Sequence, residues 1–408
     1  MATGERTYHD PLHGAITLTA SDPTEALLIR LIDTPAFQRL RRIRQLGPAS
    51  LTFHGGEGSR FTHSLGVMFV ARRCFDRLVA SYPQLLPHRP VVLVAALLHD
   101  LGHGPFSHTA EEVFGSHHEG WTMRIIRESL PIRDCLDQFD PALVELLGLV
   151  YEKKFPIPAI AQLVSSQLDC DRLDYLMRDS YLTGATYGNL DLDRIILALR
   201  YDPVTQQLVV ASKGMAAIEH YLVVRYFMYA QVYSHPKNQV ATWMLNSAMR
   251  RARVLMALGQ LQADPTVTAW LTQDCNAMAL FDYLRADDGT FLYHLQQWQD
   301  SEDGILADLS RRFLDRDLFK AKDISDLSDG DRADLLHQTQ DKLQNQGLDP
   351  EFYAGLRYAN SRGYSLYQRG INLQTPEGLR EISERSPLIK TLIQPLRRAW
   401  LIHPRGMV

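Results

Sequence analysis

Apolar residues recur at steps of three and four positions through much of this chain, which is the periodicity of an amphipathic α-helix. The segments with this pattern are 26–31, 65–79, 91–101, 142–150, 157–168, 195–199 and 215–232. Only residues 199–212 resemble β structure, because Asp202-Pro203 and Thr205-Gln206 separate two short runs, the second ending in Leu208-Val209-Val210. The pattern therefore predicts a mainly α protein with one small β-hairpin.

A break in the helical pattern near Ala263, in the sequence Ala-Asp-Pro-Thr, divides the chain into two predicted units. Residues 1–262 would form a helical core and residues 263–408 a mixed C-terminal lobe. An Asp- and Ser-rich stretch over 323–334 lacks the acidic spacing of an EF-hand loop. We expect it to lead into a helix capped by Ser328.

Composition narrows the class of protein. A hydrophobic content of 45%, a charged content of 22% and a net charge of −4 are typical of a soluble globular protein and disfavour a sequence-independent DNA binder. The cysteines Cys74, Cys135, Cys170 and Cys275 are far apart, which argues against a zinc knuckle or a disulfide framework. The N-terminus has no apolar core of a signal peptide, and the longest apolar run, 91–98, is too short to cross a membrane. We therefore expect a cytoplasmic protein.

Residues 95–108 contain the greatest concentration of potential metal-ligating and catalytic side chains. Four apolar residues there are followed directly by His99-Asp100. His103 and His108 follow within nine positions. Adjacent imidazole and carboxylate groups at the end of a buried helix are poor core material but good ligands for a divalent metal. A structural role could explain one histidine here, whereas the whole cluster predicts a functional site.

Two further segments could complete such a site. His63 begins an amphipathic helix, and on its own it would be read as a satisfied helix-terminal histidine. Asp171, Tyr175, Arg178 and Asp179 fall on one helical face at i, i+4, i+7 and i+8. That face suits either a solvated surface or the wall of a polar cavity.

In this order, His63, His99-Asp100 and Asp171 resemble the motif of HD-domain metal-dependent phosphohydrolases. The remaining motifs resemble one branch, the deoxynucleoside triphosphate (dNTP) triphosphohydrolases, which includes the mammalian enzyme with a sterile-alpha-motif domain. They are Asp10-Pro11-Leu12-His13-Gly14, 33–40, Gln45-Leu46-Gly47, 60–67 and 99–108. The resemblance is dense over about residues 8–240 and weak to about Lys320. Because the chain begins almost directly at this region, we expect no sterile-alpha-motif domain.

The resemblance implies an HD-domain core with one divalent metal per subunit, held by His63, His99, Asp100 and Asp171. Mixed nitrogen and oxygen ligands suit Mn²⁺, Fe²⁺ or Mg²⁺ and leave Zn²⁺ open, and a further Mg²⁺ could accompany the nucleotide. In this family, water attacks the α-phosphorus, and the products are a deoxynucleoside and intact triphosphate.

The catalytic residues implied are His103, His108, His118 and Glu119. His103 would contact the α-phosphate. Either His118, in His117-His118-Glu119, or His108 would give a proton to the departing 5′-oxygen. Glu111 stands where the family often has Asp, a departure that affects how the acid is oriented.

Arg60, Arg172 and Arg225 resemble the cationic clamp on the triphosphate. Arg172 stands where the mammalian relative has Lys, which keeps the charge but changes the geometry. Without the resemblance, Arg225 would be read as part of ordinary packing on the 215–232 helix.

The sugar contacts implied by the family involve five further residues. Gln45 and Asp179 resemble the pair that binds the 3′-hydroxyl. Leu46 and Tyr233 resemble the steric wall that excludes a 2′-hydroxyl, and Tyr175 would pack under the sugar. Since no element that reads the base is evident, tolerance among bases is expected.

The basic run 39–44 is typical of a solvated helix face and sometimes of a nucleic-acid patch. Within the family, the residues of a guanine-nucleotide regulatory pocket at a subunit interface would be Asp33, Gln38 and Arg41, with Arg316 and Lys320 from a neighbouring subunit. This implies a homo-oligomer, a tetramer or a dimer, activated by dGTP or GTP.

Three functions stay open from the sequence. The favoured one is a dNTP triphosphohydrolase without a membrane partner. The second is an HD phosphohydrolase acting on another nucleotide, such as a nucleoside monophosphate or a signalling nucleotide. The third is a nucleic-acid-binding or regulatory protein that retains the metal site.

Overall fold

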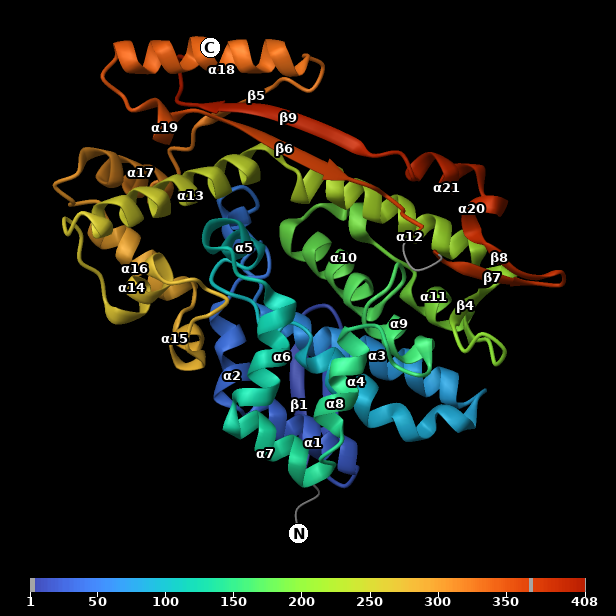
Figure 1. The fold of residues 1–408 in the computed structure, drawn as a ribbon. Helices are drawn as coiled ribbons and strands as arrows, with labels where there is room; N and C mark the ends of the chain where they lie inside the picture. The colour runs from blue at the N-terminus through green and yellow to red at the C-terminus, as the bar shows by residue number, and fades with distance from the viewer. Residues whose placement is uncertain (1–3, 367–369, 408) are drawn as a thin grey trace.

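The fold is known from a computed structural model that describes residues 4–366 and 370–407. Helices make up most of it (Figure 1). Their bounds are α1 Pro23–Ile32, α2 Pro35–Arg39, α3 Arg60–Val79, α4 Arg89–Leu98, α5 His108–Phe114, α6 His118–Glu128, α7 Leu130–Phe139, α8 Leu143–Tyr151, α9 Pro158–Val164, α10 Cys170–Thr183, α11 Leu192–Ala198, α12 Met215–Met228, α13 Pro236–Ala257, α14 Pro265–Thr272, α15 Leu280–Arg285, α16 Asp288–Trp298, α17 Gly304–Leu314, α18 Asp329–Asn345, α19 Pro350–Tyr353, α20 Ile382–Arg385 and α21 Pro387–Leu392. A π-helical turn, Tyr229–Tyr233, follows α12.

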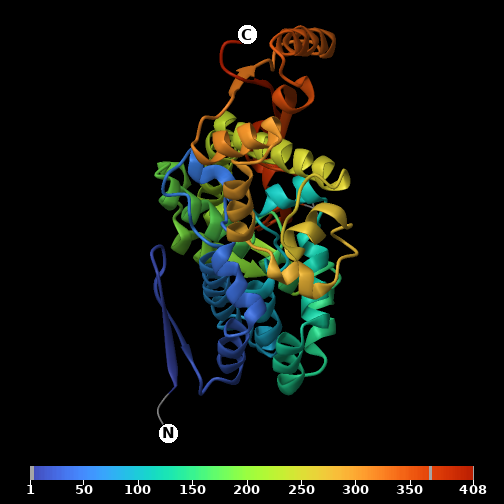
Figure 2. The ribbon, with the colours of Figure 1, turned by 90° about the vertical axis from the view of Figure 1, so that its left-hand side faces the viewer.

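The strands form three small sheets. Their bounds are β1 Glu5–Asp10, β2 Gly14–Thr19, β3 Leu199–Tyr201, β4 Leu208–Ala211, β5 Lys320–Asp323, β6 Gly355–Ser361, β7 Asn372–Thr375, β8 Gly378–Glu381 and β9 Leu396–His403. The strand orders are β1-β2, β3-β4-β7-β8 and β5-β9-β6, and among the described residues only the β4–β7 pair is parallel. The β1–β2 hairpin stands beside the helical body (Figure 2), whereas the long strands β6 and β9 lie above α12 and α13 in Figure 1.

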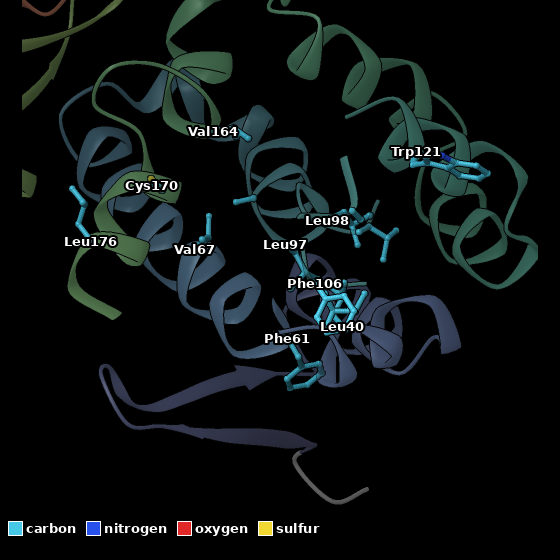
Figure 3. Close-up of a cluster of buried hydrophobic side chains, with 14 of the residues drawn as sticks. Leu40, Phe61, Val67, Leu97, Leu98, Phe106, Trp121, Val164, Cys170 and Leu176 are labelled. Atoms are coloured by element: carbon cyan, nitrogen blue, oxygen red, sulfur yellow. The ribbon is translucent and has the colours of Figure 1, made fainter. Parts of the chain in front are cut away.

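Helix α4 is the centre of the helical core. Every residue from Val91 to Leu98 is buried, because α1, α3, α8 and α9 surround the helix. Such an all-round apolar helix is stable only inside a protein. Leu97 and Leu98, at its end, lie among Leu40, Phe61 and Phe106 (Figure 3). The burial of α4 therefore carries the next residues, His99 and Asp100, into the interior.

The mainly α class and the β3–β4 hairpin are confirmed. Each of the seven predicted segments contains a helix, but the helices in 91–101 and 157–168 end earlier, at Leu98 and Val164. The cap at Ser328 is also confirmed, since Ser328 Oγ accepts a hydrogen bond from Asp331 N at 3.1 Å. The prediction that only one segment is β was wrong. The seven other strands include β5, Lys-Ala-Lys-Asp, which has no apolar alternation. β5 pairs with β9 and β7 with β4 across long stretches of chain, so tertiary pairing rather than local pattern makes these strands.

Within the described residues, none of the helices combines the length and the apolar content needed to cross a bilayer.

Candidate active site

A cavity of about 520 Å³ opens where α3, the end of α4, α6, α10 and the π-helical turn meet. It is lined by Gln45, Leu46, Arg60, His99, Asp100, His103, His108, His118, Glu119, Thr122, Tyr151, Val164, Ser165, Asp171, Arg172, Tyr175, Asp179, Tyr229 and Tyr233. Most of the substrate-contact and catalytic residues expected from the sequence therefore face one space. Arg225 does not line it.

The four expected metal ligands lie together, and three of them, His99, Asp100 and Asp171, line this cavity. His63 Nε2 is 3.0 Å from Asp171 Oδ1 and 3.5 Å from Asp100 Oδ2. His99 Nε2 is 3.2 Å from Asp100 Oδ1 and 3.6 Å from Asp171 Oδ1. Helices α3, α4 and α10 each bring part of this set, so the site forms only when the three helices pack.

The Nδ1 atoms of His63 and His99 already have hydrogen-bond partners. His63 Nδ1 is 2.8 Å from Asp174 Oδ2, and His99 Nδ1 is 2.9 Å from the carbonyl of Ala96. If each Nδ1 carries the proton, both Nε2 lone pairs face the carboxylates, and His99 Nε2 is buried without a hydrogen bond. This is the usual arrangement around a metal bound by histidine, so the residues fit a divalent ion. Burial alone would lower the pKa of His63, but Asp171 and Asp174 raise it to about 10.

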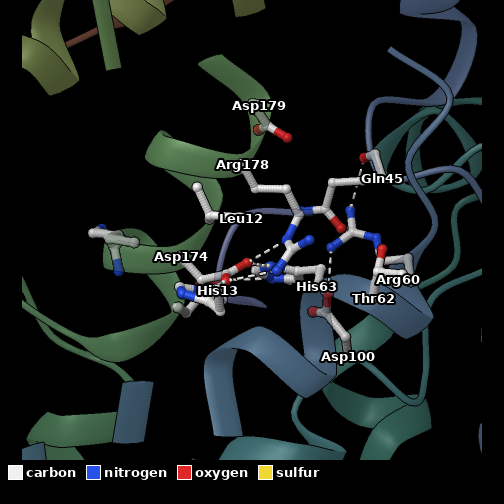
Figure 4. Close-up of polar contacts among 12 residues, drawn as sticks. Leu12, His13, Gln45, Arg60, Thr62, His63, Asp100, Asp174, Arg178 and Asp179 are labelled. Atoms are coloured by element: carbon white, nitrogen blue, oxygen red, sulfur yellow. Dashed lines mark hydrogen bonds and ion pairs between the residues drawn. The ribbon is translucent and has the colours of Figure 1, made fainter. Parts of the chain in front are cut away.

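Asp174 is a functional residue that the sequence analysis missed. His13 Nε2, from the loop after β1, lies 2.6 Å from Asp174 Oδ1, and Arg178 Nε donates to Asp174 Oδ2 at 2.8 Å (Figure 4). Gly66 makes room for this group, because a Cβ there would lie 2.0 Å from Asp174 Oδ1. Arg178 was predicted to share a helical face with Asp171, and this was wrong for its side chain. The guanidinium turns away from the cavity and pairs with Asp174, four residues earlier. The available signals were the carboxylate three residues after Asp171 and the motif containing His13.

A second cluster contains His103, His108, His118 and Glu111. The rings of His103 and His118 stack with centroids 4.1 Å apart, and His108 lies edge-on to both. Glu111 Oε1 contacts His118 Nδ1, and Glu111 Oε2 lies 3.0 Å from His108 Nδ1. Burial would raise the pKa of Glu111, but these two histidines hold it well below its ordinary value. The carboxylate that departs from the family pattern thus orients both candidate acids, while Glu119 faces the same cavity from α6.

Two of the three arginines expected at the triphosphate reach the cavity. Arg60 is buried, and its Nη1 is 2.5 Å from Asp100 Oδ2. Arg172 forms an ion pair with Asp169, the N-cap residue of α10. Arg225 lies one layer further back, where its guanidinium is 5.7 Å from the centre of the Tyr229 ring.

The π-helical turn supplies part of the cavity wall. π-Turns are frequent at functional sites, and this one presents both Tyr229 and Tyr233 to the cavity. Tyr233 donates a hydrogen bond to Asp179 Oδ2 at 2.8 Å, and the hydroxyls of Tyr175 and Tyr229 are 3.3 Å apart. Burial raises the pKa of Asp179 to about 7, although the bond from Tyr233 opposes this.

The expected regulatory residues of the N-terminal region lie on the surface, away from the cavity lining. Arg41 Nε donates to Gln38 Oε1 at 2.8 Å, and its guanidinium lies 3.6 Å from the centre of the Phe61 ring. Asp33 pairs with Arg6 of the β1–β2 hairpin. These contacts place Asp33, Gln38 and Arg41 on neighbouring elements.

Arg316 and Lys320 lie in the C-terminal lobe. Arg316 Nε donates to the carbonyl of Leu51 at 2.6 Å, and Lys320, the first residue of β5, lies opposite His403 of β9 in the strand register. Both are exposed, and neither lines the cavity.

Comparison with known proteins matches two consecutive regions of the chain. Residues 60–176, which include the four metal-site residues, match the HD domain, and residues 190–347 match the HD associated region. The chain is 36% identical to the uncharacterized protein YwfO of Bacillus subtilis over 99% of its own length and 93% of that protein. It is 30% identical to the deoxynucleoside triphosphate triphosphohydrolase SAMHD1 of Homo sapiens over 60% of this chain and 44% of that protein. A crystal structure of a phosphohydrolase from Bacteroides thetaiotaomicron is similar with a TM-score of 0.87 and 29% identity, covering 98% of this chain and 100% of that one.

Proposed function

This chain belongs to the HD-domain family of phosphohydrolases, and from that premise we propose that it hydrolyses dNTPs to a deoxynucleoside and intact triphosphate. The similarity to a relative named as a dNTP triphosphohydrolase supports this substrate. The reaction is attack of water at the α-phosphorus, assisted by one divalent ion.

One observation carries the proposal. Buried polar atoms in proteins are almost always hydrogen-bonded, yet several side-chain atoms of cavity-lining residues are buried without a hydrogen-bond partner. They are Gln45 Oε1, His99 Nε2, His103 Nδ1, Arg172 Nε and Asp179 Oδ1. One cavity thus presents unpaired donors, acceptors and metal-ligating groups that a polar ligand could contact. A nucleotide offers phosphate oxygens to the first kind and sugar hydroxyls to the second.

The residues divide the work along the cavity. His63, His99, Asp100 and Asp171 would hold a divalent ion, which would supply Lewis-acid activation of a phosphoryl oxygen. His118, oriented by Glu111, gives a proton to the 5′-oxygen as the P–O bond breaks.

The cavity offers different side chains to the phosphates and to the sugar of the nucleotide. Arg60 and Arg172 face the phosphates, whose negative charge they offset. Leu46 and Tyr233 fill the space beside C2′, where a ribose hydroxyl would need room and a partner. Asp179 and Gln45 are left to bind the 3′-hydroxyl.

The direct test is to identify products. Each dNTP and rNTP is supplied with Mn²⁺ or Mg²⁺, and the products are resolved by chromatography and ³¹P NMR. We expect deoxynucleoside and tripolyphosphate from dNTPs, with little turnover of rNTPs. The replacement Tyr233→Ala should raise rNTP turnover relative to dNTP turnover, because it opens the wall beside C2′.

Other products would contradict the proposed reaction. Orthophosphate or pyrophosphate would indicate an HD phosphohydrolase with another substrate or another point of attack. Absence of turnover with every metal and nucleotide would favour a nucleic-acid-binding or regulatory protein that retains the metal site.

We also propose that the surface around Asp33, Gln38 and Arg41 binds dGTP or GTP at an interface where a neighbouring subunit contributes Arg316 and Lys320. A cationic side chain stacked on an aromatic ring, with a carboxylate nearby, suits a guanine nucleotide. Light scattering after size exclusion should show a larger assembly, a tetramer or a dimer, when dGTP is added. Arg41→Ala should weaken that response, and a monomer under both conditions would contradict the proposal.

A further inference from the structure

We infer that residues 283–288, here called the strap, hold the catalytic loop 102–108 in its working shape, and that Tyr283 and Asp288 are positioning residues for the histidines of that loop. The strap joins the end of α15 to the start of α16, which lie in the HD associated region. The reaction to be measured rests on the proposed function, whereas the contacts between strap and loop do not.

Tyr283 holds the first residue of the loop. Its hydroxyl donates to the carbonyl of Gly102 at 2.6 Å, and the side chain is fully buried. The ring stacks on Trp121 of α6 with centroids 3.6 Å apart. Gly102 has no freedom on its other side, since a Cβ there would lie 2.1 Å from the carbonyl of His118. The residue directly before His103 is therefore fixed between α6 and the strap.

Asp288 holds the far side of the same loop. Its carboxylate is 4% exposed and accepts from the N–H of Phe106 at 2.7 Å and from the N–H of Arg44 at 3.0 Å. One carboxylate thus joins the loop that carries His103 and His108 to the segment just before Gln45. Burial raises the pKa of Asp288 to about 6, although the two N–H donors and the position at the start of α16 favour its negative charge.

The loop needs this support because its backbone is strained. Phe106 and Ser107 have φ values of 60° and 58°, in the left-handed region that costs a residue with a side chain energy. Ser107 Oγ donates to the carbonyl of Arg44 at 2.5 Å and accepts from Arg60 Nε at 2.9 Å. The bond from Phe106 to the Asp288 carboxylate and the bond from Tyr283 to Gly102 therefore support this conformation from the strap. His103 lies between the two anchored points.

The strap also provides a matched control. Asp287 precedes Asp288, caps α16 by accepting from Thr290 N at 3.0 Å, and pairs with Arg42. No contact links Asp287 to the loop among the hydrogen bonds of the described residues. Replacing either aspartate by asparagine removes the same charge from the same helix end, but only one replacement touches the loop.

The test compares Tyr283→Phe, Asp288→Asn and Asp287→Asn in the full chain with its metal. We expect Tyr283→Phe to lower kcat about tenfold and Asp288→Asn about a hundredfold, because small displacements of catalytic groups cost this much. KM should change less than kcat. Metal content should stay at the wild-type level, because all four metal-site residues lie outside the loop. Asp287→Asn should retain the wild-type kcat.

Hydrogen exchange by mass spectrometry gives a readout that needs no substrate. Both loop variants should speed exchange in peptides covering 102–109, and Asp288→Asn also in peptides covering 43–47, with α3 and α10 unchanged. Tyr283→Phe removes one oxygen and keeps the ring, so it carries the test if Asp288→Asn does not fold. Wild-type kcat and exchange in Tyr283→Phe, or equal effects of Asp287→Asn and Asp288→Asn, would overturn the inference. If the wild type hydrolyses no dNTP, the proposed function fails, and the exchange data still decide the role of the strap.

Discussion

Replacing His99 by alanine is expected to remove both the bound metal and turnover while leaving the helical fold in place. His99 Nε2 is the buried, unbonded nitrogen that faces Asp100 and Asp171, so the replacement deletes a ligand without a substitute. Lewis-acid stabilisation supplies several kcal/mol, which corresponds to a rate loss of about a thousandfold or more. Elemental analysis and steady-state rates on the same preparation measure both effects.

Circular dichroism is the check on the fold. The core around α4 is built by Val91–Leu98, which the replacement leaves untouched, so the helical signal should remain. His337→Ala is a suitable control, because His337 is exposed on α18, and it should keep both metal and rate. Full metal content in His99→Ala would show that the ligand set is wrong.

Replacing His118 by alanine is expected to lower the rate as well, but with the metal retained. His118 lies outside the group of four metal-site residues, and its contact with Glu111 equips it for proton transfer. Loss of a general acid lowers the rate by about 10²–10⁴-fold. Single-turnover rates with a dNTP, together with metal content, separate this outcome from loss of the ion.

The neighbouring residue offers the matched control. His117 is exposed, and His117→Ala should keep the wild-type rate. A wild-type rate in His118→Ala would move the acid role to His108, which shares Glu111. Loss of a second equivalent of metal from His118→Ala would instead show that the cluster of His103, His108, Glu111 and His118, which could itself hold an ion, does so.

The sequence predicted those parts of the molecule that local pattern controls. Helix α4 and the residues that follow it were evident, because an apolar run ending in His99-Asp100 needs no distant partner to be recognised. The face of α10 was predicted correctly for Asp171, Tyr175 and Asp179, which the cavity places together. The i, i+4 spacing of Asp174 and Arg178 indicates the ion pair between them, a signal that the face assignment overlooked.

The remainder depends on contacts between distant parts of the chain. His13 reaches Asp174 across 161 positions, and Phe106 reaches Asp288 across 182. Neither pair has a spacing rule that a single sequence could reveal. Arg225 was expected at the phosphates, but Tyr229 covers it, and which of two neighbouring residues on a helix reaches a cavity is decided by packing.

The wide separation along the chain between the residues of each contacting pair sets the order in which parts of the molecule can fold during synthesis. Chain closure over long loops is slow, and each closure must wait until both ends have been synthesised. A growing polypeptide therefore carries His99 and Asp100 long before residues 283–288 leave the ribosome. Until they do, Phe106 lacks the Asp288 carboxylate that holds its strained backbone. A nascent chain should thus turn over nucleotides slowly, and full activity should begin only when α16 has joined the fold.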